Sequence, residues 1–125
     1  MARAIGIGGI FIKARDPKAL GAWYRDNLGL SIEEWGGAIL KFSDDPTPRE
    51  SGYAVWSLFP ESTKHFPQAC MVNFRVDDLD ALLAKLRAAG CNVDEKGSED
   101  DYGRFGWVTD PEGNRVELWQ PRVMS

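Results

Sequence analysis

The chain has 125 residues, of which 43% are hydrophobic and 27% charged, which is enough apolar material for one domain with a sizeable core. Its 15 basic and 19 acidic side chains give a net charge of -4, and no basic run is long enough to follow a phosphate backbone. We therefore expect no nucleic-acid partner. No segment approaches the roughly 18 apolar residues of a membrane span, so we expect no membrane association and a cytoplasmic protein.

The beginning of the chain predicts a strand followed by a helix. Residues 5–14 are rich in isoleucine and phenylalanine, and Asp16-Pro17 then supplies a helix cap with proline at the first helical position. The helix should end before Gly29, a residue that readily takes the left-handed conformation after a helix. Its apolar residues recur at helical spacing: Leu20, Trp23, Tyr24 and Leu28. We expect Trp23 to lie in the core.

Three further strands are predicted in the first half. Residues 30–35 and 38–42 flank Gly36-Gly37 and read as a hairpin. Residues 43–51, with two prolines and several charges, predict a loop, and residues 53–59 predict the last strand before Pro60. The first half therefore has the order β-α-β-β-β.

The second half repeats this order after a polar linker. Residues 71–76 predict a strand, Asp78 a helix cap, and Gly90 the end of a helix. The apolar stripe of this helix consists of Leu79, Leu82, Leu83 and Leu86. Three strands should follow, over residues 92–96, 104–109 and 115–120, with a turn at residues 110–114 joining the last two.

We interpret residues 1–125 as a single domain of two modules, 5–60 and 70–121, joined by a linker at 61–69. The residues themselves repeat, since Phe11-Ile12-Lys13-Ala14-Arg15-Asp16 matches Asn73-Phe74-Arg75-Val76-Asp77-Asp78. Two equal halves imply a pseudo-twofold axis with a site between them.

Three groups of residues form a recognisable combination of motifs: Trp23-Tyr24 with Leu28-Gly29-Leu30, the two capping aspartates, and Asp110-Pro111-Glu112-Gly113-Asn114-Arg115-Val116-Glu117-Leu118. Together they resemble the vicinal-oxygen-chelate superfamily of glyoxalases, bleomycin-resistance proteins and ring-cleaving dioxygenases. The resemblance covers nearly the whole chain. It implies an α+β fold in which two βαβββ modules form a curled mixed sheet, often completed in a homodimer. It also implies a divalent metal held at four strand positions.

The residues at those four positions are poor metal ligands. The resemblance places them at Gly9, Trp56, Met71 and Glu117, of which only Glu117 offers a good donor. The only histidine, His65, lies in the linker, where we expect a solvated residue. We therefore predict no metal and no cofactor. The loops at Asp44-Asp45 and at residues 99–101 stay open as alternative sources of a ligand.

Strand alternation predicts which side chains face the cup. If Val116 and Leu118 pack on a helix, Glu117 and Trp119 point the other way. The same reasoning on the other strands completes the set of expected ligand-binding residues: Phe11, Trp56, Met71, Asn73, Arg75, Trp107, Glu117 and Trp119. The tryptophans either line a pocket for a flat or cationic molecule or fill the space that a metal would occupy.

Glu117 has three interpretations, because a carboxylate in an apolar pocket needs a partner. It pairs with Arg75 or Arg115, it acts as a catalytic general base, or it anchors a cationic or hydroxyl-bearing ligand. The favoured function is a metal-free, homodimeric protein that binds an aromatic or cationic organic molecule. The alternatives are a metal-dependent glyoxalase-like lyase, isomerase or dioxygenase that uses Glu117, and a metal-independent enzyme with Glu117 as base.

Overall fold

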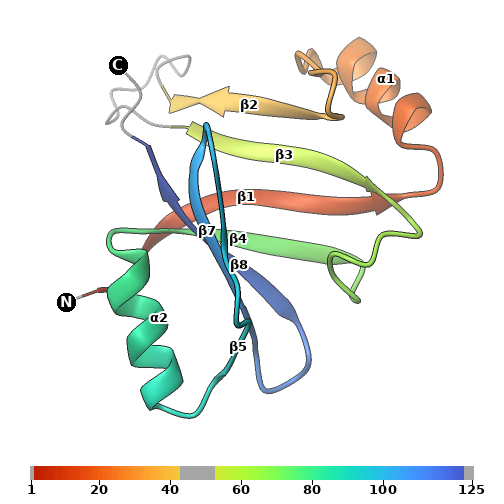
Figure 1. Cartoon of the computed structure of the whole chain (residues 1–125). Coiled ribbons are helices and arrows are strands. Elements are labelled where there is room, and N and C mark those ends of the chain that lie inside the picture. The colour runs from red at the N-terminus through yellow and green to blue at the C-terminus, as the bar shows by residue number, and fades with distance from the viewer. Residues whose placement is uncertain (1, 43–52, 123–125) are drawn as a thin grey trace. The chain divides into compact units, whose positions relative to one another are not determined.

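The computed structural model describes residues 2–42 and 53–122, and over these it contains two helices and eight strands (Figure 1). The chain divides into two compact units, an N-terminal unit of Gly9–Cys70 and a C-terminal unit of Met1–Gly8 with Met71–Ser125. Strand β1, Ala4–Ala14, contributes to both. No helix in the described residues is long and apolar enough to span a membrane.

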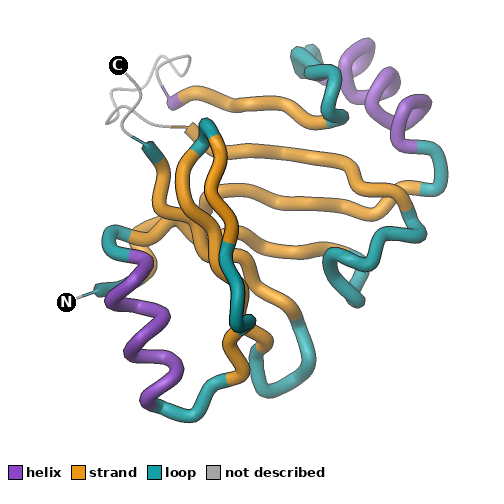
Figure 2. Tube along the Cα trace, viewed as in Figure 1, coloured by secondary structure: helices purple, strands orange, loops and turns teal. Residues whose placement is uncertain are grey.

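The N-terminal unit is built on three paired strands. Strand β3 (Tyr53–Pro60) pairs in parallel with β1 and antiparallel with β2 (Gly37–Lys41), which gives the order β2-β3-β1 (Figure 2). Helix α1, Pro17–Leu28, follows β1. Parallel and antiparallel pairs therefore occur together in this unit, as the predicted mixed sheet requires.

The predicted limits of α1 are confirmed, whereas the predicted position of Trp23 is wrong. The Asp16 carboxylate accepts a hydrogen bond of 3.0 Å from the Ala19 amide at the start of the helix, and Gly29 takes a left-handed φ of 73° at its end. Trp23 is 52% exposed and borders an open groove along α1, where its ring meets the edge of the neighbouring Tyr24 ring with 5.1 Å between centroids.

The predicted hairpin between residues 30–35 and 38–42 is wrong. Residues 30–35 form no strand, and β2 begins at Gly37 and pairs with β3. The glycine pair makes a turn instead, in which Gly36 has a φ of 96° and its amide donates to the Glu33 carbonyl at 3.0 Å. The predicted loop at residues 43–51 lies outside the described residues.

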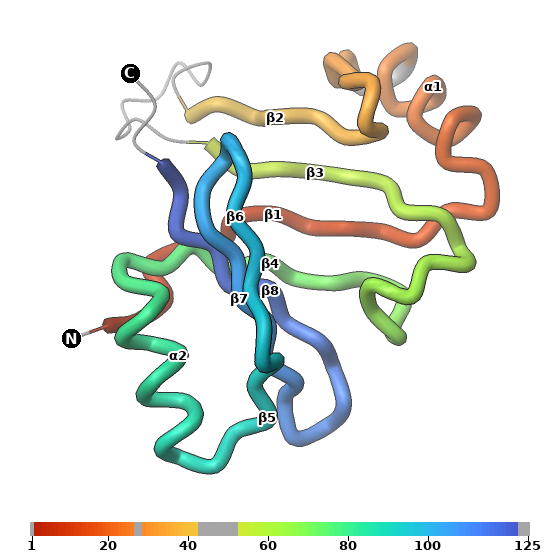
Figure 3. Tube along the Cα trace, viewed as in Figure 1, coloured from red at the N-terminus to blue at the C-terminus, as the bar shows by residue number. Residues whose placement is uncertain are grey.

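The C-terminal unit contains a second set of paired strands (Figure 3). Strand β8 (Arg115–Pro121) pairs in parallel with β4 (Cys70–Val76) and antiparallel with β7 (Gly103–Thr109). Two short strands, β5 (Asn92–Val93) and β6 (Ser98–Asp100), pair antiparallel with β7. We predicted β5 as a longer strand and did not predict β6, because three charged or polar residues carry no apolar pattern.

Helix α2, Leu79–Ala88, covers one face of these strands (Figure 1). The Asp78 carboxylate caps it through the Ala81 amide at 3.1 Å, as predicted. The core between helix and sheet consists of Val76, Leu79, Leu82 and Leu118, with Val116 packed against it. The α+β fold class with a capping aspartate before each helix is thereby confirmed.

The turn at residues 110–114 fixes the pairing of β7 with β8. The Asp110 carboxylate accepts hydrogen bonds from the amides of Glu112 and Asn114, each at 2.9 Å, and from the Asn114 side chain at 3.1 Å. These bonds, chiefly those from Asn114, lower the pKa of Asp110 below its ordinary value. The motif from Asp110 to Asn114 is therefore a structural device that sets the register of the strand carrying Glu117.

Candidate functional site

The face of β8 opposite α2 carries the predicted central residue, Glu117. Leu118 lies in the core with Leu79 and Leu82 of α2, and Val116 packs against the same cluster. Because successive side chains of a strand point to opposite faces, Glu117 and Trp119 lie on the other side of the sheet. The expected alternation along β8 is confirmed.

Neighbouring strands hold the Glu117 carboxylate from both sides. Glu117 stands opposite Asn73 of β4 and opposite Trp107 of β7 in the strand registers. Its Oε2 accepts a 2.6 Å hydrogen bond from Asn73 Nδ2, and its Oε1 accepts a 3.0 Å bond from Trp107 Nε1. Glu117 is only 4% exposed. These two neutral donors stabilise and orient a buried carboxylate.

The other amide atom of Asn73 is a buried acceptor. Asn73 is 2% exposed, and its Oδ1 has no hydrogen-bond partner among the described residues. Since Nδ2 donates to Glu117, the amide orientation is set and Oδ1 points toward Gly8 of β1. Buried acceptors in proteins are nearly always hydrogen-bonded, so Oδ1 marks a place where a donor is needed.

An ion pair between Arg115 and Asp94 lies against the ring of Trp107. The Arg115 guanidinium forms an ion pair with the Asp94 carboxylate and lies over the Trp107 ring, 4.9 Å from its centroid. A cation above an indole is attracted to its π electrons and fixes the ring in place. The Trp107 N–H is thereby directed at Glu117. Arg115 therefore acts on Glu117 through Trp107, and the pairing of Glu117 with Arg75 or Arg115 that the sequence suggests stays a prediction.

Trp119 is anchored two residues farther along β8. Its Nε1 donates a 3.0 Å hydrogen bond to the Tyr102 carbonyl, and its ring is parallel to that of Phe105 at 6.1 Å. Arg75 of β4 stands opposite Trp119 in the register, and Met71 of the same strand is fully buried. Six of the eight predicted ligand-binding residues thus belong to the C-terminal unit: Met71, Asn73, Arg75, Trp107, Glu117 and Trp119.

The remaining two predicted residues belong to the N-terminal unit. Phe11 stacks on Phe59 at 5.4 Å, and Trp56 contacts Tyr24 at 4.5 Å between ring centroids. Both therefore have aromatic neighbours within their own unit. Their part in a common site with Glu117 stays a prediction.

Sequence reasoning missed the residues that hold the others in place. Gly8 leaves room for the Asn73 side chain, Asp94 positions Arg115, and the Tyr102 carbonyl holds Trp119. Only Gly8 carried a signal, because a glycine inside a strand often marks a close approach of another group.

The residues at the implied metal positions do not fit a divalent ion. Gly9, Trp56 and Met71 supply no hard or borderline donor, which leaves the Glu117 carboxylate as the one suitable ligand of the four. In the part of the chain that the structure describes, no three His, Cys, Asp or Glu side chains are grouped as ligands. His65 is not the solvated residue we expected, since it is partly buried and stacks on Phe59 at 5.6 Å.

Comparisons with known proteins agree with this fold. The family model of the glyoxalase-like domain matches residues 9–119. A Streptomyces coelicolor methylmalonyl-CoA epimerase variant in complex with 2-nitronate-propionyl-CoA is 22% identical, with a TM-score of 0.69 over 97% of this chain and 100% of that one. The Mycobacterium tuberculosis methylmalonyl-CoA epimerase is 21% identical, with a TM-score of 0.59 over 95% of this chain and 89% of that one.

A more distant structure shares the same fold. A glyoxalase/bleomycin resistance protein/dioxygenase superfamily member from Vibrio splendidus 12B01 is 12% identical, with a TM-score of 0.55 over 96% of this chain and 99% of that one. Among curated proteins no match was found. At these identities the similarity to solved structures establishes the fold alone, and the chemistry of the site has to be inferred from the residues of this chain.

Proposed function

We propose that this chain, which belongs to the glyoxalase-like domain family, is a small-molecule-binding protein that works without a metal and anchors a hydrogen-bond-donating, cationic organic ligand at Glu117. The observation that carries the proposal is the pair of acceptors on adjacent strands. The Glu117 carboxylate is buried and oriented by two N–H groups, and the buried Asn73 Oδ1 beside it has no donor among the described residues.

A ligand N–H group fits this pair better than a neutral apolar group does. An ammonium or a protonated ring nitrogen would donate to Asn73 Oδ1 and experience the negative charge of Glu117, whereas an apolar ligand would leave Oδ1 without a donor. Hydrogen bonds that involve a charged group contribute about 1.5–3 kcal/mol. The site should therefore bind a cationic N–H donor more tightly than an apolar ligand of the same size.

The aromatic residues around the carboxylate support a ligand with a flat ring. Trp107 donates to Glu117, and Trp119 and Phe105 are parallel on the adjoining strands. Indole rings bind cations and planar systems through their π faces. A cationic aromatic molecule combines both complementary features.

The enzyme alternatives have weaker support from the residues. Two of the similar structures are methylmalonyl-CoA epimerases, and that activity is a property of those proteins. A metal-dependent reaction here would have to use ligand positions occupied by Gly9, Trp56 and Met71, which lack suitable donors. A metal-independent reaction with Glu117 as base would need a second catalytic group, for which we have no candidate.

Dimerisation is a further part of the proposal. Ile5 and Ile7 of β1 are 51% and 47% exposed, so an apolar strand segment is open to a partner. A second copy that covers this segment would produce the homodimer we predicted. Light scattering at micromolar concentration should give twice the chain mass. A monomer that persists at those concentrations would refute this part.

The proposed ligand class can be tested with 1-naphthylmethylammonium and its neutral analogue, 1-naphthalenemethanol. In a ¹⁵N NMR titration, the cation should shift the Asn73 side-chain amide and the Trp107 indole N–H, because both contact the anchoring carboxylate. The neutral analogue should bind roughly tenfold or more weakly. Equal affinity for the two probes, or shifts confined to other residues, would refute Glu117 as a cation anchor.

A further inference from the structure

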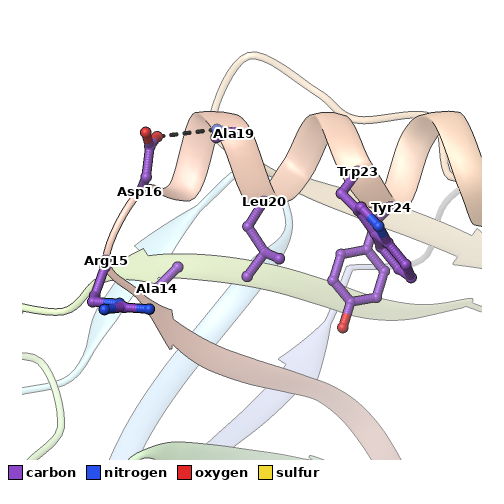
Figure 4. A pocket seen from close by; sticks show the side chains of 7 residues that line it. All are labelled: Ala14, Arg15, Asp16, Ala19, Leu20, Trp23 and Tyr24. Carbon is purple, nitrogen blue, oxygen red and sulfur yellow. Dashed lines mark hydrogen bonds between the residues drawn. The ribbon is translucent and has the colours of Figure 1, made fainter.

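A groove of about 790 Å³ lies along helix α1 in the N-terminal unit (Figure 4). Its lining consists of Ala14, Arg15, Asp16, Ala19, Leu20, Trp23 and Tyr24. This volume falls within the range of about 300–1,000 Å³ that is typical of small-molecule sites. None of these residues is used by the site around Glu117.

One end of the groove is aromatic and held in place. Leu20, Trp23 and Tyr24 are three and four residues apart, so they share one face of α1. Tyr24 contacts Trp56 of β3 at 4.5 Å and meets Trp23 edge-on at 5.1 Å between ring centroids. Trp23 nevertheless remains 52% exposed. The half-exposed indole, next to a tyrosine held by Trp56, offers a surface on which a planar molecule can stack.

The other end carries a positive charge. Arg15 is exposed, and no described residue forms a hydrogen bond or ion pair with its side chain. The adjacent Asp16 carboxylate is occupied by the Ala19 amide at 3.0 Å. Figure 4 shows Asp16 turned back to the start of the helix, while Arg15, Leu20 and Tyr24 extend to the same side. Asp16 keeps its negative charge but directs it at the first turn of α1, so Arg15 is the cation that a ligand meets at this end of the groove.

We propose that this groove binds a planar organic anion, an aryl carboxylate, with its ring against Leu20, Trp23 and Tyr24 and its carboxylate at Arg15. A guanidinium pairs with a carboxylate in a bidentate geometry that suits this end of the groove. From the N-cap Asp16 to Tyr24 the chain advances roughly 12 Å at about 1.5 Å per residue, which is long enough for a two-ring compound. The proposal is independent of the cation site at Glu117.

The test uses 1-naphthoate as the probe, with 1-naphthalenemethanol as its neutral analogue. A ligand of this size should bind with a dissociation constant on the order of 0.1–1 mM, so NMR titration to several millimolar is suitable. Naphthoate should shift the Trp23 indole N–H and the Leu20 methyl groups. The neutral analogue should bind about tenfold more weakly, because it lacks the charge that Arg15 recognises.

Paired variants separate the groove from non-specific effects. Arg15→Gln should weaken naphthoate binding about tenfold, whereas Lys18→Gln removes the same charge from an exposed residue outside the lining and should change it less than twofold. Trp23→Ala should abolish the shifts at Leu20, whereas Trp35→Ala, at another exposed tryptophan, should not.

The outcomes separate this proposal from the proposed function. Glu117→Gln should leave naphthoate affinity unchanged, since Glu117 is not among the residues that line the groove. Absence of naphthoate shifts at Leu20 and Trp23 would overturn the groove proposal and leave the Glu117 site standing. Equal losses for Arg15→Gln and Lys18→Gln would also overturn it, because they would indicate a general charge effect.

Discussion

The Asn73 side chain occupies the space in which a β-carbon of Gly8 would lie. An ideal Cβ on Gly8 would be 1.9 Å from Asn73 Oδ1 and 2.8 Å from the Trp119 ring. Gly8 is thus the position on β1 where the absence of a side chain lets Asn73 reach Glu117. The site depends on a glycine that performs no chemistry.

Gly8→Ala should destabilise the protein by about 1–3 kcal/mol, because the added methyl group must displace Asn73 or Trp119. Urea unfolding measures the change. Gly6→Ala on the same strand is the matched control, since no atom lies within 4 Å of its Cβ position, and it should change stability by less than about 0.5 kcal/mol. Equal effects of the two variants would disprove the steric role of Gly8.

Trp107→Phe should cost about 1–3 kcal/mol of stability, because it removes the N–H group that donates to the buried Glu117 carboxylate. Trp35→Phe makes the same chemical change at a residue that is 45% exposed and should be close to neutral. Adding Glu117→Gln to Trp107→Phe should reduce the penalty, because an uncharged amide needs the donor less. Additive effects in this double-mutant cycle would contradict the contact.

The Asp110 turn should make stability depend on pH below the ordinary range of an aspartate. The folded-state pKa of Asp110 is lowered, so the stability from its hydrogen bonds is fully present above the ordinary pKa of 3.8 and is lost as the pH falls through the folded-state pKa. Asp110→Ala should therefore lower the urea midpoint at pH 6 and have a diminishing effect below pH 3.8. Asp101→Ala, at an exposed aspartate of the β6–β7 turn, should show no such trend.

Chelation should leave the melting temperature of the purified protein unchanged. The expectation rests on the residue types at Gly9, Trp56 and Met71, which leave Glu117 as the one suitable ligand at the four implied positions. Thermal unfolding with and without EDTA, together with elemental analysis, checks it. About one transition metal per chain, lost with a clear fall in melting temperature, would show that the metal-free assignment is wrong.

Local signals predicted the helices and the last turn. Asp16 and Asp78 precede apolar helical stripes, and the turn from Asp110 needs only hydrogen bonds within itself, so neighbouring residues suffice to determine them. The strand predicted at residues 30–35 was wrong for the opposite reason. Their apolar alternation resembles a strand, but strand pairing is a long-range choice, and β2 pairs with β3 instead.

The sequence predicted which face of β8 carries Glu117, but it did not predict the hydrogen-bond partners of that carboxylate. Alternation along β8 predicted that Glu117 lies on one face of the strand and that Val116 and Leu118 lie on the other, and the packing of those two residues at the core confirms it. The partners of Glu117 depend on the registers of β4 and β7 with β8, which a sequence does not reveal. Trp107 was predicted as a lining residue, and its role as a donor to the carboxylate emerged only from the contact distance.

The most direct test of the proposed function is the affinity of Glu117→Gln for 1-naphthylmethylammonium, measured by calorimetry or NMR. The substitution keeps the size of the side chain but removes its charge, so the account predicts a ten- to hundredfold loss, equivalent to about 1.5–3 kcal/mol. Glu95→Gln, at an exposed glutamate, should bind the probe as the unaltered protein does. A folded Glu117→Gln protein with unchanged affinity for the cation would contradict the account.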